Sequence, residues 1–267
     1  RAWAYWSMDL YPQAFKSAGL IAEGNPFYKW YERTLKDAPP AFLITMGAMQ
    51  RRFLEEFYNG RTFPGVDMPC GIMAPSGSVP SDAPEWWTPH DDKVYLGYCG
   101  NLGEAHSDLF VQAVMERLDP HKHVFILSVY GSRADAVLES ARGIEAVRIV
   151  RSVPRRHLTF IDVHLVSLRS EWSHVCSPSK GFSAVCSGSA LLFCGATDTD
   201  LDHYLRPATI LVDEGTDPGA QLDVIMPRLD RKRVDELKRK AGECTPDLVA
   251  LKSSAFQGIA EWLHKQQ

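Results

Sequence analysis

The stretch SPSKGFSAVCSGSALLFCG, residues 177–195, holds one complete helix–strand unit. A Ser-Pro-Ser turn leads into a run of small residues, the run ends at Gly188, and the apolar segment ALLFCG follows. This order predicts a short helix with Ser179 as its N-cap and a buried strand over residues 190–195. Lys180 falls in the first helical turn, where unpaired N–H groups already carry partial positive charge. A lysine is unfavourable there unless it faces an anion, so the stretch indicates an anion site.

The same alternation of apolar segments and helical patterns runs through the rest of the chain. Strands are predicted at residues 94–100, 123–131, 147–150, 163–168, 190–195 and 208–212, with helices between them. Three more strands are predicted before residue 73, at residues 1–8, 41–46 and 66–72. Asn25-Pro26 predicts one helix start, and Asn59-Gly60 predicts a helix end. Apolar strands separated by helices predict α/β architecture, with doubly wound parallel sheets covered on both faces.

A change in composition divides the chain. Residues 72–92 carry four prolines among Ser, Gly and acidic residues, which is typical of a linker. We therefore expect an N-terminal domain over 1–71, the linker at 72–92, a second domain over 93–244 and a last helix over 245–267. That helix is expected to begin at Thr245-Pro246 and to bury four residues, Phe256, Ile259, Ala260 and Leu263.

The chain opens directly into the strand-like RAWAYW, so we expect the first part of its N-terminal domain to be missing. An exposed edge strand leaves backbone N–H and C=O groups unpaired. We therefore expect the edge of such a partial sheet to be covered by a second copy of the chain, in a homo-oligomer, or by a swapped element.

Composition excludes several classes of protein. The 267 residues carry a net charge of −4, which gives no electrostatic reason to expect nucleic acid. The six cysteines form no C-x-x-C pair and no zinc spacing, so we expect reduced, mostly buried thiols in a cytoplasmic protein. We expect no signal peptide, and no apolar run in the sequence reaches the length of a membrane span. The basic stretch at 228–240 predicts a solvated helix face, with a patch for an anionic membrane surface as the alternative.

The segment YCGNLGEAH, residues 98–106, is a second candidate for anion binding. A predicted strand runs into Gly100 and Gly103, and a helix follows. Glycines allow close approach of the backbone to a ligand, and the helix start offers N–H donors. Ligands of doubly wound sheets lie beyond the carboxyl ends of strands, where this loop falls. A tight turn without a ligand is the alternative.

Arg169 and Lys180 lie at neighbouring strand ends on the predicted sheet. Arg169 follows the strand at 163–168, and Lys180 opens the next helix. Two cations opposite a glycine loop would form a clamp for a diphosphate. Solvated side chains are the alternative for both.

Together, YCGNLGEAH, HLVSLRSEW and PSK with its glycine-ended helix resemble the C-terminal half of a GT-B glycosyltransferase. The resemblance is to family-4-like retaining enzymes of bacterial surface polysaccharide synthesis, and WSMDLYPQAFKSAGL resembles a stretch of their N-terminal domain. It implies two Rossmann-like domains facing a cleft. It also implies a nucleotide-sugar donor in the C-terminal domain, an acceptor in the N-terminal one, and no essential metal or other cofactor.

The resemblance also implies roles for individual residues. Lys180, Arg169 and Asp9 would be catalytic, with Lys180 on the diphosphate and Asp9 on the N-terminal face of the cleft. The donor-binding residues it implies are Gly100, Asn101, Gly103, His106, Ser179, Lys180, Ser183, Thr199 and Asp200. The sequence departs from the family where Val175 and Ser183 replace two glutamates of the nucleotide site, and where His174 replaces a glycine. Ser183 retains a hydroxyl that could bind a ribose.

Asp198-Thr199-Asp200 has the spacing of a D-x-D metal motif. It follows the last strands of a doubly wound domain, which is the wrong context for that motif. A loop near the donor, or a helix cap by Asp200, is the favoured interpretation, and no metal site is predicted.

These observations favour a glycosyltransferase that moves a sugar from a nucleoside-diphosphate sugar to a glycan or lipid-linked acceptor. UDP is the nucleotide that we expect in the donor. A peripheral contact with the inner face of a membrane is compatible with such an acceptor. Two alternatives stay open: a nucleotide-sugar epimerase on the same architecture, and a non-catalytic nucleotide-sugar-binding or scaffold protein.

Overall fold

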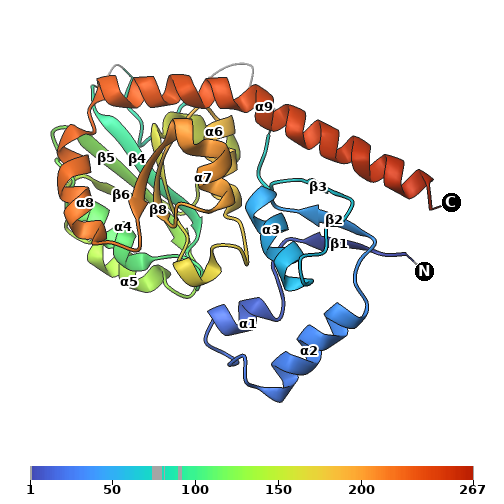
Figure 1. The fold of residues 1–267 in the computed structure, drawn as a ribbon. Coiled ribbons are helices and arrows are strands. Elements are labelled where there is room, and N and C mark those ends of the chain that lie inside the picture. The colour runs from blue at the N-terminus through green and yellow to red at the C-terminus, as the bar shows by residue number, and fades with distance from the viewer. Residues whose placement is uncertain (1, 74–79, 81, 90–91, 267) are drawn as a thin grey trace.

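Two parallel β-sheets form the frame of the protein in a computed structural model that describes residues 2–73, 80, 82–89 and 92–266 (Figure 1). The first sheet has the strand order β1-β2-β3 and the second the order β6-β5-β4-β7-β8-β9. The strands are β1 (Ala4–Ser7), β2 (Phe42–Thr45), β3 (Gly65–Asp67), β4 (Val94–Asn101), β5 (His123–Tyr130), β6 (Val147–Ile149), β7 (Val163–Ser167), β8 (Ala190–Gly195) and β9 (Thr209–Asp213).

Helices cover both sheets. The α-helices are α1 (Gln13–Ser17), α2 (Pro26–Asp37), α3 (Ala48–Phe57), α4 (Asp108–Met115), α5 (Ala134–Ser140), α6 (Ser179–Cys186), α7 (Asp200–Leu205), α8 (Pro218–Ile225) and α9 (Arg231–His264). Four short 3-10 helices join them: η1 (Arg155–Phe160), η2 (Ser170–Trp172), η3 (Arg206–Ala208) and η4 (Met226–Arg228).

The six-stranded sheet is doubly wound, as the sequence predicts. Its order reverses between β4 and β7, which pair in parallel with Leu96 opposite Val163. Leu165 belongs to the core under α4, α5 and α8, and its neighbour Val166 belongs to the core under α6 and α7. Alternate side chains of one strand therefore enter different cores, as expected for a sheet buried on both faces. The crevice between β4 and β7 is where a doubly wound sheet binds ligands.

The three-stranded sheet lies between α3 and the C-terminal part of α9. Leu43 packs with Leu54 of α3, and Phe42 stacks on Trp262 of α9 at 5.2 Å between ring centroids. All four residues of β2 are buried. Helix α9 thus runs across both sheets and joins their cores (Figure 1).

Local signals predict several helix ends correctly. The Asn25 side chain accepts a hydrogen bond from the Phe27 N–H at 2.8 Å, and Pro26 is the first residue of α2. Helix α3 ends at Phe57, two residues before Asn59 and Gly60, whose φ angles are 60° and 77°. Asparagine and glycine are the residues that adopt this left-handed conformation most easily.

Two predicted caps are wrong. Pro178 holds the N-cap position of α6, and Ser179 is the first helical residue. Thr199 caps α7 by accepting from the Asp202 N–H, so Asp200 already lies in the first turn. Its carboxylate is free to serve another helix, as described below.

The last helix begins at Arg231, not at Thr245-Pro246. Pro246 lies inside α9, where it removes one backbone donor, but α9 continues because it packs on both sheets. The buried side of this helix is predicted only in part: Ile259 packs beside buried Ala255, whereas Phe256, Ala260 and Leu263 are exposed. Helices α1 and α8, one only five residues long, were not predicted.

The basic stretch at 228–240 is only partly solvated. Arg231 and Lys238 turn inward onto the buried carboxylate of Asp162 at 2.9 and 2.7 Å, while Val234 packs in the core. Other side chains of the stretch pair along the helix, as Arg239 does with Glu236.

The six cysteines all lie in the described part and are free, but only Cys186 and Cys194 are fully buried. Trp87 of the linker packs on Phe160. Within the described residues, no helix has both the length and the apolar character that a membrane span needs.

Candidate functional site

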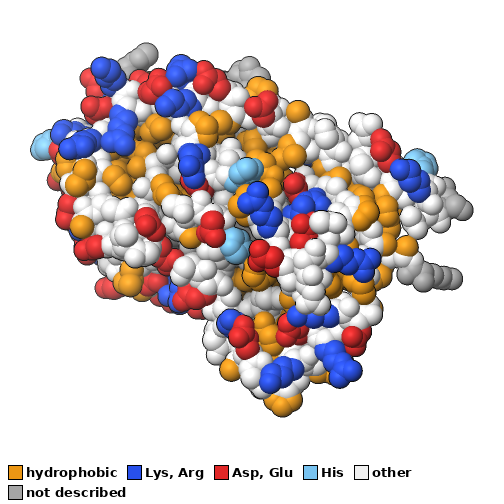
Figure 2. Space-filling view, viewed as in Figure 1, with side chains coloured by type: hydrophobic (Ala, Val, Ile, Leu, Met, Phe, Trp, Pro, Cys, Tyr) orange, Lys and Arg blue, Asp and Glu red, His pale blue; other side chains and the backbone are white. Residues whose placement is uncertain are grey.

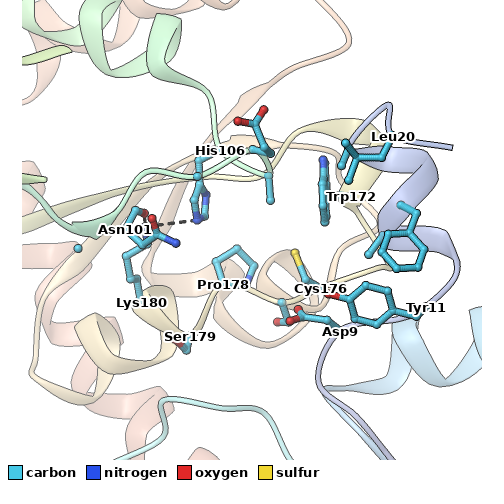
Figure 3. Close-up of a pocket in the computed structure, with 18 of the residues that line it drawn as sticks. Asp9, Tyr11, Leu20, Asn101, His106, Trp172, Cys176, Pro178, Ser179 and Lys180 are labelled. Carbon is cyan, nitrogen blue, oxygen red and sulfur yellow. Dashed lines mark hydrogen bonds between the residues drawn. The ribbon is translucent and has the colours of Figure 1, made fainter. Parts of the chain in front are cut away.

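A pocket of about 560 Å³ lies between the two sheets, at the carboxyl end of β4. One wall consists of the loop that follows β4 and the start of α6. The other wall consists of Asp9 and residues of α1 and its flanks. Figure 3 shows Lys180, Asn101 and His106 together on one side of the pocket, with Asp9 and Tyr11 on the other. The pocket therefore occupies the crevice that the strand order predicts.

Lys180 reaches from α6 to the carboxyl end of β4. Its Nζ donates to the Tyr98 hydroxyl at 2.8 Å and to the Asn101 carbonyl at 2.6 Å. The same ammonium lies 4.4 Å from the centroid of the Tyr98 ring. Gly100 lies beside this side chain, and its φ of +120° is a conformation that favours glycine. The lysine is held over the glycine loop and does not point into solvent.

His106 approaches the same ammonium. Its Nδ1 lies 2.5 Å from the Ser167 carbonyl, so Nδ1 carries the proton and Nε2 is an acceptor. Nε2 lies 3.4 Å from Lys180 Nζ, the contact drawn dashed in Figure 3. Burial, and then the charge of Lys180, lower the pKa of His106 to about 4. The imidazole is therefore neutral at physiological pH.

Burial also lowers the pKa of Lys180 to about 7. A desolvated amine loses charge more readily, because the interior solvates an ammonium less well than water does. Two of its three N–H groups are held by good acceptors, while the third faces His106 at a long distance. An anion that enters the pocket can take that third donor and restore the full charge of the amine.

The opposite wall is acidic and aromatic. The backbone of Asp9 forms an isolated antiparallel β-bridge with Cys176, and burial raises the pKa of the Asp9 carboxyl group. Tyr11, Phe15 and Trp172 line the pocket beside it. No sequence pattern singles out these three rings, although Tyr11 and Phe15 fall in the same stretch as Asp9, where a helix facing the cleft would place them in the pocket.

Two buried polar atoms of this pocket have no hydrogen-bond partner. They are Nε1 of Trp172 and Oγ of Ser177. Nearly all buried polar groups of native proteins are hydrogen-bonded, so unsatisfied ones beside a cavity indicate groups that a ligand or water completes.

Seven of the residues implied by the resemblance line this pocket. They are Asp9, Gly100, Asn101, Gly103, His106, Ser179 and Lys180.

The other four are not among the residues that line it. Arg169 pairs with Glu171 at 3.1 Å, and the Ser183 hydroxyl donates to the Gly71 carbonyl at 3.0 Å. Thr199 caps α7, and Asp200 contacts the first sheet's domain. The roles of these four residues at a donor stay predictions.

Asp200 caps a helix of the other domain. Its carboxylate accepts from the backbone N–H groups of Met49 and Gln50, at 2.8 and 3.3 Å, at the start of α3. Gly47 allows this approach, since a Cβ there would lie 2.3 Å from Asp200 Oδ1. Asp198 is paired as well, with His174 at 3.3 Å. Both D-x-D carboxylates thus make contacts within the protein, and the described residues contain no group of three or more side chains suited to hold a metal ion.

Comparison with known proteins identifies the fold. No family model and no curated protein sequence matches the chain. Among solved structures, the chain is similar to WaaG, a glycosyltransferase involved in lipopolysaccharide biosynthesis, with a TM-score of 0.71 and 14% identity over 94% of this chain and 73% of that one. It is also similar to a sucrose-phosphate synthase from Thermosynechococcus elongatus, with a TM-score of 0.70 and 14% identity over 99% and 68% of the two chains.

A third similar structure is the pneumococcal O-GlcNAc transferase GtfA in complex with UDP and GlcNAc. Its TM-score is 0.66 and its identity 14%, over 98% of this chain and 53% of that chain. These likenesses confirm the predicted fold class: the chain has a GT-B fold, with two Rossmann-like parallel-sheet domains facing a common pocket.

Proposed function

We propose that the protein is a glycosyltransferase that transfers a sugar from a nucleoside-diphosphate sugar to a glycan or lipid-linked acceptor. UDP is the nucleotide that we expect in the donor. The observation that carries this proposal is the placement of Lys180. Its ammonium lies over the Gly100–Gly103 loop, at the start of α6 and at the switch point of a doubly wound sheet. A helix start, a glycine loop and a lysine together provide the donors that a diphosphate needs.

The chemistry assigns each wall a task. The bond between the anomeric carbon and the β-phosphate oxygen breaks, and a bond from the acceptor oxygen to that carbon forms. Negative charge grows on the departing diphosphate, where Lys180 stabilises it. The carboxylate of Asp9 accepts a hydrogen bond from a hydroxyl of the acceptor beside the reacting one and so orients the acceptor. The proton of the reacting hydroxyl leaves with the diphosphate, which places both reacting oxygens on one face of the sugar and retains the configuration.

The structural neighbours support the same class of reaction. WaaG and GtfA are glycosyltransferases, and GtfA was solved with UDP and GlcNAc bound. A trehalose-phosphate synthase described as UDP-forming is another neighbour, with a TM-score of 0.65 and 9% identity.

Calorimetric titration of UDP and of GDP tests the proposal. We expect one of the two nucleotides to bind and Lys180→Met to weaken it by about tenfold to a hundredfold, since a charge-assisted phosphate contact contributes about 1.5–3 kcal/mol. Lys232→Met, an exposed lysine of α9, is the matched control and should bind like the wild type. Failure of both nucleotides to bind a folded protein would contradict the proposal.

A second candidate function is nucleotide-sugar binding without transfer. It rests on the two positions where relatives carry glutamates: Val175 is buried in the core, and the Ser183 hydroxyl is engaged by Gly71. Neither offers a carboxylate to a ribose. UDP binding without donor turnover, across a panel of glycan and lipid-linked acceptors, would favour this candidate.

A further inference from the structure

A row of aromatic rings leads out of the pocket along α1 and α2. Tyr11 contacts Phe15 at 4.9 Å between centroids, and Phe15 contacts Phe27 at 6.4 Å. Phe27 in turn contacts Trp30 at 5.8 Å and Tyr31 at 6.2 Å. We call these five rings the aromatic row. Its first two members line the pocket, so the row is continuous with the proposed reaction site.

Three rings of the row are open to solvent. Tyr11 is 41% exposed, Phe27 46% and Trp30 60%. Single exposed apolar side chains are common, but exposed rings in mutual contact form a patch, and such patches mark binding surfaces. Since the row is not covered by another described part of the chain, its occupant comes from outside.

The charges around the row are balanced. Residues 9–37 contain four basic and four acidic side chains. Several are already paired, as Lys16 is with Glu23, Lys36 with Glu32 at 2.8 Å and Arg33 with Asp37 at 3.5 Å. Figure 2 shows hydrophobic, basic and acidic side chains mixed at the end of the molecule formed by α2. This region has no net charge to attract an anionic membrane or a polyanion.

We propose that the aromatic row binds the outer sugars of an extended, uncharged oligosaccharide acceptor. A sugar ring has apolar C–H faces and a rim of hydroxyl groups. The faces pack on Tyr11, Phe27 and Trp30, whose rings offer large rigid contact area. The hydroxyl rim meets the interspersed lysines and carboxylates, which provide donors and acceptors. The inference rests on the proposed function, because it places the terminal sugar of this chain at Asp9.

An oligosaccharide array, read with the purified full chain, tests the proposal. The probes are uncharged oligosaccharides of one to six sugars that represent the common linkages. We expect binding that strengthens with length, and Trp30→Ala should weaken binding of the longer chains by about fivefold to tenfold. Trp3→Ala, another exposed tryptophan outside the row, is the matched control and should bind like the wild type.

Two further readouts separate the possible results. Trp30→Ala should bind UDP as the wild type does when measured by calorimetry. If the wild type itself does not bind UDP, the proposed function is refuted, whereas the proposal for the aromatic row is judged by oligosaccharide binding. Binding to vesicles of zwitterionic or mixed anionic phospholipid that depends on Trp30 would overturn the oligosaccharide proposal in favour of a membrane surface. Absence of any oligosaccharide binding, or equal binding by wild type and Trp30→Ala, would overturn it as well.

Discussion

Binding of UDP should depend steeply on pH through one side chain. The pKa of Lys180 is about 7 in the empty protein, so about half of the molecules carry the charged amine at about pH 7 and about 3% at about pH 8.5. A diphosphate binds the charged form and raises the pKa of the amine. Apparent affinity should therefore fall about fifteenfold from pH 7 to 8.5.

Titration calorimetry in buffers of different ionisation enthalpy measures this coupling. At about pH 8 each UDP bound should take up about 0.9 proton, and at about pH 7 about 0.5. His106 contributes nothing in this range, since its pKa of about 4 keeps it neutral. Above pH 7 the terminal phosphate of UDP is almost fully ionised, so it adds little proton exchange.

Lys180→Met is the decisive variant. It should bind UDP weakly, with an affinity that no longer changes between pH 7 and 8.5 and without proton uptake. The same variant also removes the cost in folding free energy of burying the ammonium. That cost is fully present below about pH 7 and disappears as pH rises towards 10.5. Without UDP, the variant should therefore be more stable than the wild type at neutral pH. A pH-independent affinity in the wild type, or a dependence that persists in the variant, would refute the reasoning.

Three further predictions concern stability and are measured by urea unfolding. Gly131→Ala should cost about 2–4 kcal/mol, because its φ is +115° and a Cβ would lie 2.2 Å from Asn101 Oδ1; an unchanged midpoint would contradict it. Asp200→Ala should lower the free energy of unfolding by about 1–2 kcal/mol, because it removes the cap of α3 that the second domain supplies. Asp217→Ala removes the cap of α8 within the second domain, so it should leave the unfolding of the first domain unchanged. Asp162→Asn should cost about 3–5 kcal/mol by leaving two cations without a buried carboxylate. Because those cations lower the pKa of Asp162, its contribution is present above about pH 4 and is lost as pH falls further; a stability difference between wild type and variant that does not shrink below about pH 4 would argue against it.

Periodicity and turn chemistry predicted most of the fold. The strands of the second sheet are continuous apolar runs, and this pattern alone indicates a parallel sheet covered on both faces. The predictions failed where tertiary contacts override local rules. Pro246 predicts a helix start, but packing on two cores carries α9 through it. Helix α1 has only five residues, too few to show a period.

The candidate site was predicted unevenly for a similar reason. Gly100, His106 and Lys180 follow strand ends, and the carboxyl ends of neighbouring parallel strands meet in space. Asp200 also lies near the end of a strand, yet its carboxylate turns to the start of α3. No local pattern shows which helix end a carboxylate will cap. The aromatic wall combines Tyr11 and Phe15, at α1, with Trp172 of η2, so it forms only where the two domains meet.

The most direct test of the donor site is a crystal structure of the protein with UDP. The structure predicts a diphosphate between Lys180 Nζ and the loop from Gly100 to Gly103, with a phosphate oxygen at the start of α6. Lys180 should keep its contact with the Tyr98 hydroxyl. UDP bound elsewhere, or a diphosphate in this pocket without contact to Lys180, would contradict the assignment.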